Sequence, residues 1–506
     1  KDPNQVLASP TTELVVVRGY LRPGIQKGDH FDIEVRTLSR SECKTLRDGW
    51  LMECRMRETA LLDNSLHEGT VLARAAGSIL VDPSASTDDK IARCRGRVLG
   101  GGTSVTSREM GLVIKAAERN ILLSAQIGSA VNRRFHSFDA GIKVGVADPK
   151  TDEFIHVKLH PRYKDNIERY MRVLRALPIR ETPVQQQSRL KLLERQLLDP
   201  ITAAAAALRL EAIGKPAIDV LRKGLDSSEE EVRFYSAEAL AYLDDSKACD
   251  TLGQLARDVP AFRAYALAAL SAMDCLEAYE ALRDLLKSSS AETRYGAFRS
   301  LWAMNARDPL VRGELLGQQF SYHVLNTQGP PMIHVTRSFR PEVVLFGDEQ
   351  RFQTPLMLEA GKNIVVTSID DEHVTVSRFV LDEPDQKRVV SPNIDEVIRA
   401  IVELGGSYPD VVQALQHAKS SGALSSRFQI DALPQGGRQY QRKDDPSTEE
   451  ESTPDIVVAN PLPDLFTPRG NAGEKRPERQ ERESSSSQDE KTPRWKAILG
   501  RLTGKS

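Results

Sequence analysis

The stretch IDEVIRAIVELGGSYPDVVQALQHAKSSGALSSRFQI, residues 394–430, decides the fold of its part of the chain. Its first half repeats apolar side chains at the helical period, at Ile394, Val397, Ile398, Ile401 and Val402. Gly405–Gly406 ends this helix, because glycine adopts the left-handed conformation at little cost. Pro409 and Asp410 suit the first turn of a second helix. The stretch therefore predicts helix, break, helix, break and strand.

Strands are predicted just before this helix pair. PEVVLFG (341–347) and NIVVTS (363–368) are apolar runs, and HVTVSRF (373–379) alternates between apolar and polar residues. The C-terminal part of the folded chain is therefore expected to mix strands and helices.

Residues 10–160 read as mainly β. FDIEVRTL (31–38) alternates cleanly, which predicts a strand with one buried face. LVVVRG (14–19) is a continuous apolar run, typical of a strand buried on both faces. GTVLARAAGSILVD (69–82) predicts two strand pieces broken at Gly77.

A hairpin and two helices follow. IKVGVAD (142–148) and FIHVKLH (154–160) flank a turn and predict a hairpin. Helices are expected at about 124–135 and 163–177, and Pro178 ends the second.

An internal repeat is the strongest signal within the chain. EVRFYSAEALAYLDD (231–245), AFRAYALAALSAMDC (261–275) and ETRYGAFRSLWAMNA (292–306) align without gaps, and each is paired with a second helical segment. These units resemble short HEAT-like repeats. One such unit cannot bury its apolar face alone, whereas a stack of about four can. We therefore predict a helical repeat region at 182–325.

The repeats align three arginines, Arg233, Arg263 and Arg294. In one interpretation they line a concave surface that binds a partner. In the other, they are solvated residues of the first helical turn whose stems pack locally.

From about residue 435 the composition becomes polar, charged and proline-bearing, which predicts a disordered tail over 435–506. PLPDLFTP (461–468) stands out as a short recognition segment. WKAILGRL (495–502) is a basic amphipathic stretch in which Trp495 is a candidate contact for a partner or a membrane surface. The alternative is a frayed tail, because isolated helices this short are marginal.

Charge and composition argue against a nucleic-acid-binding protein and against a membrane-spanning helix. The net charge of −2 provides no overall basic field of the kind that indicates nucleic-acid binding. The sequence contains no run of 18 apolar residues, which is about the length that a helix needs to span a membrane. Five cysteines include no CxxC pair, and Cys43 and Cys54 either form a disulfide or are small half-buried residues.

Catalytic and cofactor motifs are also missing from the sequence. There is no GxSxG, and the glycines at 100–102 lack the dinucleotide-binding spacing. His156 and His160 share a face of a predicted strand but lack a third metal ligand. We therefore expect no enzymatic activity, cofactor or metal.

Several short motifs carry a family resemblance. VIRAIVELGG, YPDVVQALQHAK and SGAL within 394–430 resemble the C-terminal element of the bacterial flagellar P-ring protein family. LRDGWLMECRM (46–56), GTVLARAAGSILV (69–81) and RGRVLGGG (95–102) are similar to its N-terminal strands, although Asp48 replaces a glycine of the family pattern. The family usually opens with a glycine-rich stretch that this sequence lacks, so we expect an N-terminal truncation.

The resemblance implies a structural subunit of the periplasmic ring of the flagellar basal body. Such a ring is a bushing around the rotating rod that contributes to motility. Its implied partners are copies of itself, rod and outer-membrane ring proteins, and peptidoglycan, with a further unknown partner on the repeats.

The predicted fold class is α+β, with a mixed, mainly β ring-building region interrupted by the repeats. The predicted parts are a first P-ring-like region at 1–180, the repeat insertion at 182–325, a second P-ring-like region at 336–434 and the tail at 435–506. The alternative function is a scaffold or adaptor of another cell-envelope ring assembly that binds partners through its repeats.

Overall fold

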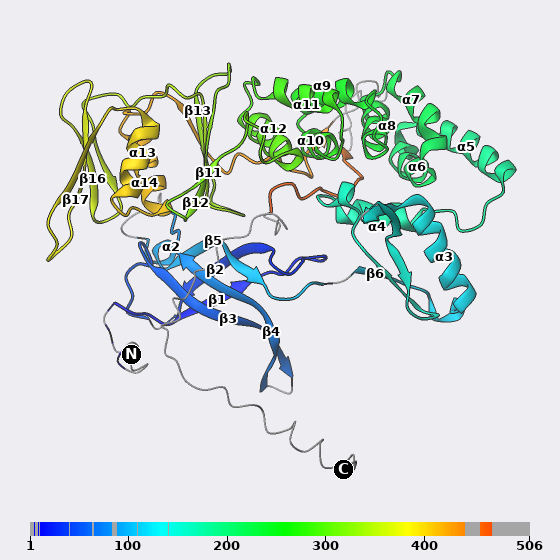
Figure 1. The fold of residues 1–506 in the computed structure, drawn as a ribbon, viewed down its shortest axis with the longest axis horizontal. Coiled ribbons are helices and arrows are strands. Elements are labelled where there is room, and N and C mark those ends of the chain that lie inside the picture. The colour runs from blue at the N-terminus through cyan, green and yellow to red at the C-terminus, as the bar shows by residue number, and fades with distance from the viewer. Residues whose placement is uncertain are drawn as a thin grey trace, which may run out of the picture. The chain divides into compact units, whose positions relative to one another are not determined.

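The computed structural model describes residues 11–39, 41–62, 65–82, 89–108, 110–139, 141–440 and 456–467, together with residues 5 and 9. Within these ranges, helices accompany several sheets, which confirms the α+β prediction (Figure 1). The described residues belong to one compact unit. Trp495 lies outside the described residues. No helix in the described ranges is long and apolar enough to cross a bilayer.

The first sheet has the strand order β1-β2-β5-β4-β3. Its strands are β1 Val15–Gly19, β2 His30–Thr37, β3 Trp50–Leu62, β4 Ser65–Ser78 and β5 Arg95–Ser104, with the short helix α2 Lys90–Arg93 before β5. Phe31, Ile33 and Val35 of β2 are buried, as the alternating pattern predicts. The prediction for 14–19 is wrong, because β1 is an edge strand that pairs only with β2 and is half-buried.

A small α/β module follows. It contains β6 Met110–Val113, η1 Ala116–Glu118, α3 Ile121–Arg134, β7 His136–Asp139, β8 Ile142–Gly145, β9 Ala147–Pro149, β10 Phe154–Val157, η2 Pro161–Tyr163 and α4 Ile167–Arg175. Both predicted helices are present. The hairpin prediction is only partly correct, because residues 142–145 form β8, which pairs with β7, and only the short β9 pairs with β10. The side chain of Asn120 caps the start of α3.

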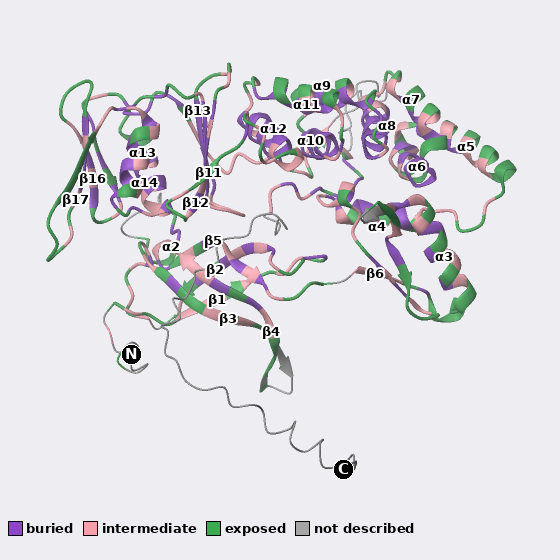
Figure 2. Ribbon diagram, viewed as in Figure 1, coloured by how far each residue is buried: buried purple, intermediate pink, exposed green. Residues whose placement is uncertain are grey.

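The repeats are paired helices, and in the last three pairs the second helix is mostly buried (Figure 2). The first helices are α5 Pro183–Leu197, α7 Ile218–Leu225, α9 Ala248–Asp258 and α11 Leu276–Leu285, and the second helices are α6 Pro200–Ile213, α8 Glu230–Tyr242, α10 Arg263–Ser271 and α12 Ala291–Met304, with η3 Lys215–Ala217 before α7. One apolar core runs from the α/β module through all of these helices.

The repeat region ends earlier than predicted. Its last helix stops at Met304, and residues 314–325 form two strands of the next sheet. The prediction that the helical insertion extends to 325 is therefore wrong at its C-terminal boundary. Phe320 and Tyr322 are buried in the core of that sheet and its helices, and Leu325 is buried in the core of the repeats.

The C-terminal α/β region places the helices α13 Ile394–Glu403 and α14 Tyr408–Ser420 between two sheets (Figure 1). One sheet has the order β11-β12-β14-β13-β19 and the other β15-β16-β17-β18. Their strands are β11 Glu314–Leu316, β12 Phe320–Leu325, β13 Met332–Val335, β14 Glu342–Phe346, β15 Met357–Ala360, β16 Ile364–Ser368, β17 Val374–Arg378, β18 Gln386–Val390 and β19 Arg427–Ile430. The predicted helix–helix–strand order of residues 394–430 is confirmed.

Part of the predicted tail is ordered. We call residues 432–440 and 456–467 the strap. It contains β20 Gln439–Tyr440 and β21 Ile456–Val457, which pair with each other. Val458, Asn460 and Leu465 are buried. A structureless tail from 435 is therefore a wrong prediction for these stretches, because the strap buries apolar side chains against the repeats.

Candidate functional site on the helical repeats

Each of the three aligned arginines caps the helix before its own. Arg233 donates to the carbonyl of Ser227 at 2.8 Å, just after α7. Arg263 donates to Ala256 O of α9 at 3.0 Å, and Arg294 donates to Leu286 O after α11 at 2.9 Å. A cation at the C-terminal end of a helix satisfies free carbonyls and opposes the helix dipole. These contacts give the arginines a structural role, and their predicted role in partner binding stays a prediction.

Burial of these arginines increases along the array. Arg233 is half-buried, whereas Arg263 and Arg294 are buried. Burial lowers the pKa of Arg294 to about 10, with the nearby Arg427 acting in the same direction. Neither interpretation from the sequence matches this arrangement fully, since two of the three guanidinium groups are shielded from solvent.

The strap binds to a surface of the repeats that lies beside the three arginines. The position two residues after each arginine is Tyr235, Tyr265 or Gly296. The Tyr235 hydroxyl accepts from the backbone N–H of Ala459 at 3.1 Å, and the backbone of Gly437 hydrogen-bonds Tyr265. A Cβ on Gly296 would lie 2.7 Å from Pro434 Cγ, so glycine makes room for the strap there.

Acidic residues two positions before the arginines also hold the strap. Glu231 accepts a hydrogen bond from the Tyr440 hydroxyl. Glu292 accepts from Arg438 at 2.6 Å and from Arg263 at 3.2 Å. The middle repeat has alanine at this position, and it contributes no such contact. Repeat-equivalent positions on α8, α10 and α12 therefore form one continuous binding surface.

Aromatic contacts complete the strap-binding surface. The Tyr440 ring lies 4.8 Å from the ring of Phe262, and Phe466 stacks on Tyr295 with 6.0 Å between centroids. Phe466 belongs to the segment at 461–468 that the sequence singles out for recognition. In this segment Phe466 contacts the repeats, whereas Asp464 pairs with Arg22 at 2.5 Å.

A buried cluster of charges lies under the strap. Arg169 of α4 pairs with Glu211 of α6 at 2.5 Å and with Glu238 of α8 at 2.7 Å, and all three side chains are 0% exposed. Asn460 of the strap donates its amide to Glu238. One positive and two negative charges share this site, and burial raises the pKa of Glu238. The cluster joins the α/β module, two repeats and the strap.

A second buried ion pair joins the last repeat to the following sheet. Arg299 of α12 donates to Glu342 of β14 at 3.1 Å, and Tyr295 donates to the same carboxylate at 2.7 Å. Burial alone would raise the pKa of Glu342, but Arg299 and Arg340 hold it at about 2. This carboxylate is therefore an anion that anchors the end of the array.

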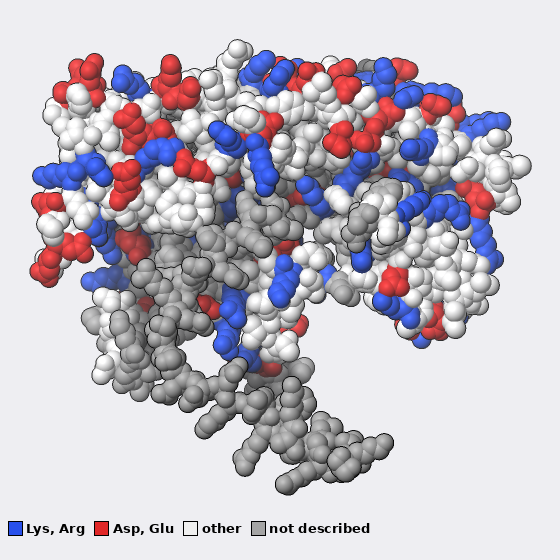
Figure 3. Space-filling view, viewed as in Figure 1, with Lys and Arg blue, Asp and Glu red and all other residues white. Residues whose placement is uncertain are grey.

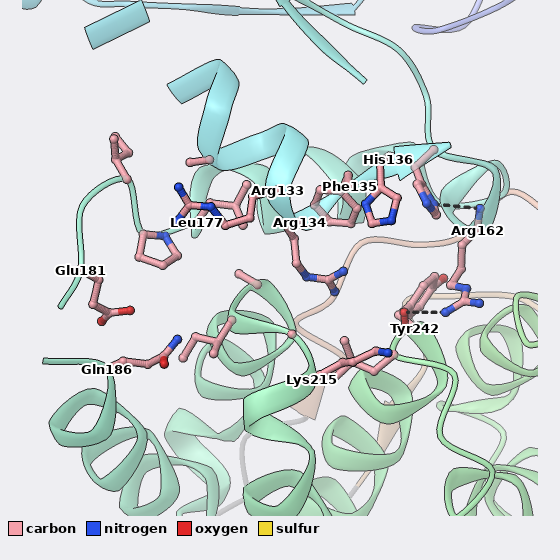
Figure 4. Close-up of a pocket in the computed structure, with 18 of the residues that line it drawn as sticks. Arg133, Arg134, Phe135, His136, Arg162, Leu177, Glu181, Gln186, Lys215 and Tyr242 are labelled. Atoms are coloured by element: carbon pink, nitrogen blue, oxygen red, sulfur yellow. Dashed lines mark hydrogen bonds between the residues drawn. The ribbon is translucent and has the colours of Figure 1, made fainter. Parts of the chain in front are cut away.

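A cavity of about 700 Å³ opens between the α/β module and the first repeats (Figure 4). Its cationic lining consists of Arg133, Arg134, Arg162 and Lys215, with Glu181 as the acidic residue. Arg134 donates to Glu211 O at 2.9 Å, and Arg162 pairs with Asp244 at 2.9 Å. Arg133 and Lys215 are exposed, so this lining can attract an anionic group.

The two histidines considered as metal ligands lie on different elements. His156 lies in β10, whereas His160 lies beyond the end of that strand and lines the cavity. Burial, together with Arg162 and Arg134, lowers the pKa of His160 to about 4. Across the described ranges, no group of three His, Cys, Asp or Glu side chains is placed to hold a metal ion.

Acidic and basic side chains are intermixed over the face in view (Figure 3). This distribution matches the net charge of −2.

Comparison with known proteins identifies the repeat class. Residues 188–271 match the family model for HEAT repeats, so this part of the chain consists of HEAT repeats. Among solved structures, the complex of CpcE and CpcF of phycocyanin lyase from Nostoc sp. PCC7120 contains a similar chain. The identity is 20% and the TM-score 0.21, over 24% of this chain and 84% of that chain. No curated protein matches the chain.

Proposed function

We propose that this chain is a non-enzymatic structural subunit of a ring in the bacterial cell envelope, of the type of the flagellar basal-body P-ring, located in the periplasm. The observation that carries the proposal is the unit at 394–430. There α13 and α14 pack between two sheets, and the chain returns as β19 to pair with β13. The order of these elements is that of the motifs which carry the resemblance.

The N-terminal motifs add support. The segments 46–56, 69–81 and 95–102 include β3, β4 and β5 in whole or in part, which are neighbours in one sheet. Motifs that lie apart in the sequence therefore belong to one structural unit. This is expected if the three motifs belong to one ring-building domain.

Ring closure requires head-to-tail contacts between different surfaces of identical subunits. Strand β3 is an edge of its sheet, and its residues Trp50 and Met52 are 66% and 65% exposed. Exposed apolar edge strands tend to pair with another chain. We therefore expect this edge to form part of a subunit contact.

The repeats would be an added partner-binding surface of such a ring. The surface on α8, α10 and α12 is already occupied by the strap. A partner would therefore bind elsewhere on the array. Val184 and Leu192 of α5 and Ile201 of α6 are exposed aliphatic residues at its N-terminal end.

Electron microscopy of basal bodies isolated with and without this gene tests the proposal. Loss of the periplasmic ring in the deletion, with recovery by the wild-type gene, is the expected result. A ring that persists, or a host without flagella, would overturn the P-ring assignment. Fractionation of the host cells checks the periplasmic location independently.

A second candidate is an adaptor of another envelope assembly. The HEAT repeats at 188–271 favour it, since such arrays commonly bind proteins, and this array already holds an extended segment. Binding assays with the full chain would compare Ile201→Glu with Lys191→Glu, an exposed control on the neighbouring helix. An adaptor loses its partner in the first variant and keeps it in the second.

A further inference from the structure

Two cysteine sulfurs in neighbouring repeats are in contact. The Sγ atoms of Cys249 and Cys275 lie 3.8 Å apart. Cys249 is in the first turn of α9, and Cys275 is the residue before α11. These two helices are the first members of consecutive repeats. The sulfurs of Cys43 and Cys94 instead donate to backbone carbonyls at 3.3 Å, and Cys43 and Cys54 are both free thiols.

The geometry suits a covalent link. A disulfide bond is about 2.05 Å long, so the two sulfurs need to approach by less than 2 Å. Cys275 has extended backbone, with φ −140° and ψ 155°, outside the regular helix. Its χ1 is therefore not restricted by a preceding helical turn. Rotation of the Cys275 side chain can therefore bring its sulfur closer to that of Cys249.

We propose that Cys249 and Cys275 form a disulfide that joins two consecutive repeats when the chain meets a small-molecule disulfide oxidant. Cys275 is half-buried, whereas Cys249 is 1% exposed. The oxidant therefore reaches Cys275 first, and Cys249 completes the reaction from inside the array.

The reaction balances in two exchange steps. The Cys275 thiolate attacks one sulfur of the oxidant, whose S–S bond breaks and whose second sulfur leaves as a thiol. Cys249 then loses its proton to solvent and attacks Cys275 Sγ, which releases the other half of the oxidant as a second thiol. Two cysteine thiols are oxidised and one disulfide is reduced. Burial raises the pKa of Cys249, with Cys275 adding to the effect, so the second step should be the slower one and should speed up with pH.

The bond would brace the array. Repeat proteins are held by contacts between neighbours, so one weak interface can open separately. A disulfide closes the loop from 249 to 275, which contains most of α9 and all of α10. It would limit the freedom of the unfolded chain and hold these neighbours together.

Oxidised glutathione with the purified full chain tests the proposal. Thiol titration under denaturing conditions should count five thiols before treatment and three after it. Tryptic digestion without reduction should then yield the peptides 248–257 and 264–283 joined by a disulfide. The melting temperature of the oxidised chain should exceed that of the reduced chain by about 5 °C or more.

Matched variants complete the test. Cys275→Ser and Cys249→Ser should each abolish the joined peptide and the thermal shift, whereas Cys54→Ser should retain both. Reduced Cys275→Ser should have the circular dichroism spectrum of the reduced wild type, which checks its fold. Five thiols after treatment, glutathione trapped on Cys275, or a link through Cys43 or Cys94 would each overturn the proposal. The assay uses purified protein, so its outcome is independent of any ring assembly.

Discussion

The side-chain amide of Asn460 donates a hydrogen bond to the carboxylate of Glu238, which lies 222 residues earlier in the chain. Both side chains are buried. The contact fastens the strap to α8 directly over the charge cluster of Arg169, Glu211 and Glu238. The repeats, the α/β module and a segment predicted to be disordered are thereby joined at one site.

Replacing Asn460 with alanine should loosen the strap. The substitution removes a hydrogen bond to a buried charged group, which costs about 1–3 kcal/mol. Amide hydrogen exchange over residues 456–467 should therefore accelerate by about tenfold or more. Gln439→Ala, an exposed residue of the same strap, is the control and should leave the exchange unchanged. Equal protection in both variants would show that this contact does not hold the strap.

Replacing the cation of the charge cluster should destabilise the chain more than replacing one of its carboxylates. Arg169→Met leaves two buried carboxylates without their cation and should destabilise the chain by about 3–5 kcal/mol. Glu238→Gln removes the excess negative charge and should have a much smaller effect. Arg172→Ala removes an exposed pair with Glu168 and should change stability by less than about 1 kcal/mol. Urea unfolding of the three variants checks this order, and a large loss for Glu238→Gln would contradict it.

The capping arginines should stabilise the array in proportion to their burial. Arg294→Ala and Arg263→Ala should each cost about 1–3 kcal/mol, and Arg233→Ala should cost less. Arg195→Ala, an exposed residue of α5, is the control in thermal melts. If all three variants melt like the wild type while binding of a partner is lost, the arginines serve recognition instead.

His334 should make the chain acid-sensitive. Its Nε2 accepts the backbone N–H of Ala432, where the strap begins, and burial lowers its pKa to about 3. A lowered folded-state pKa stabilises the fold above the unfolded pKa of about 6.5, and this stability is lost as the pH falls toward 3. The loss from this group should reach about 2 kcal/mol at pH 5.

Melting temperatures measured between pH 7 and pH 4 check this behaviour. His334→Gln should reduce the slope of the profile, because glutamine does not titrate in this range, while the buried His160 keeps part of the slope. His67→Gln, at an exposed position, should retain the wild-type profile. A wild-type profile without any slope below pH 6.5 would contradict the prediction.

Local patterns in the sequence predict most of the secondary structure. The alternation at 31–38, the helix pair at 394–420 and the aligned repeats all correspond to observed elements. The wrong predictions concern which elements lie next to each other in the fold. LVVVRG at 14–19 is apolar enough for a central strand, but the topology places it at an edge. The end of the repeats was predicted too late, although Phe320, Tyr322 and Val324 alternate with Ser321 and His323, which is the pattern of a strand.

The candidate site was only partly predictable. The recognition segment at 461–468 and the aligned arginines are visible in the sequence. The functional positions beside those arginines, such as Tyr235 and Glu292, were missed. Their signal is a tyrosine two residues after two of the arginines and a glutamate two residues before two of them. Without the position of the strap, nothing distinguishes them from other exposed or core residues.

The sequence by itself determined the period of the repeats, the order of helices and strands, and the presence of HEAT repeats at 188–271. These properties depend on backbone geometry and on the spacing of apolar side chains over a few turns. Only the tertiary structure decided that Asn460 meets Glu238, that the arginines cap preceding helices, and that Cys249 meets Cys275. Such contacts join residues that are far apart in the sequence, so they exist only once the packing of the elements has set the distance between them.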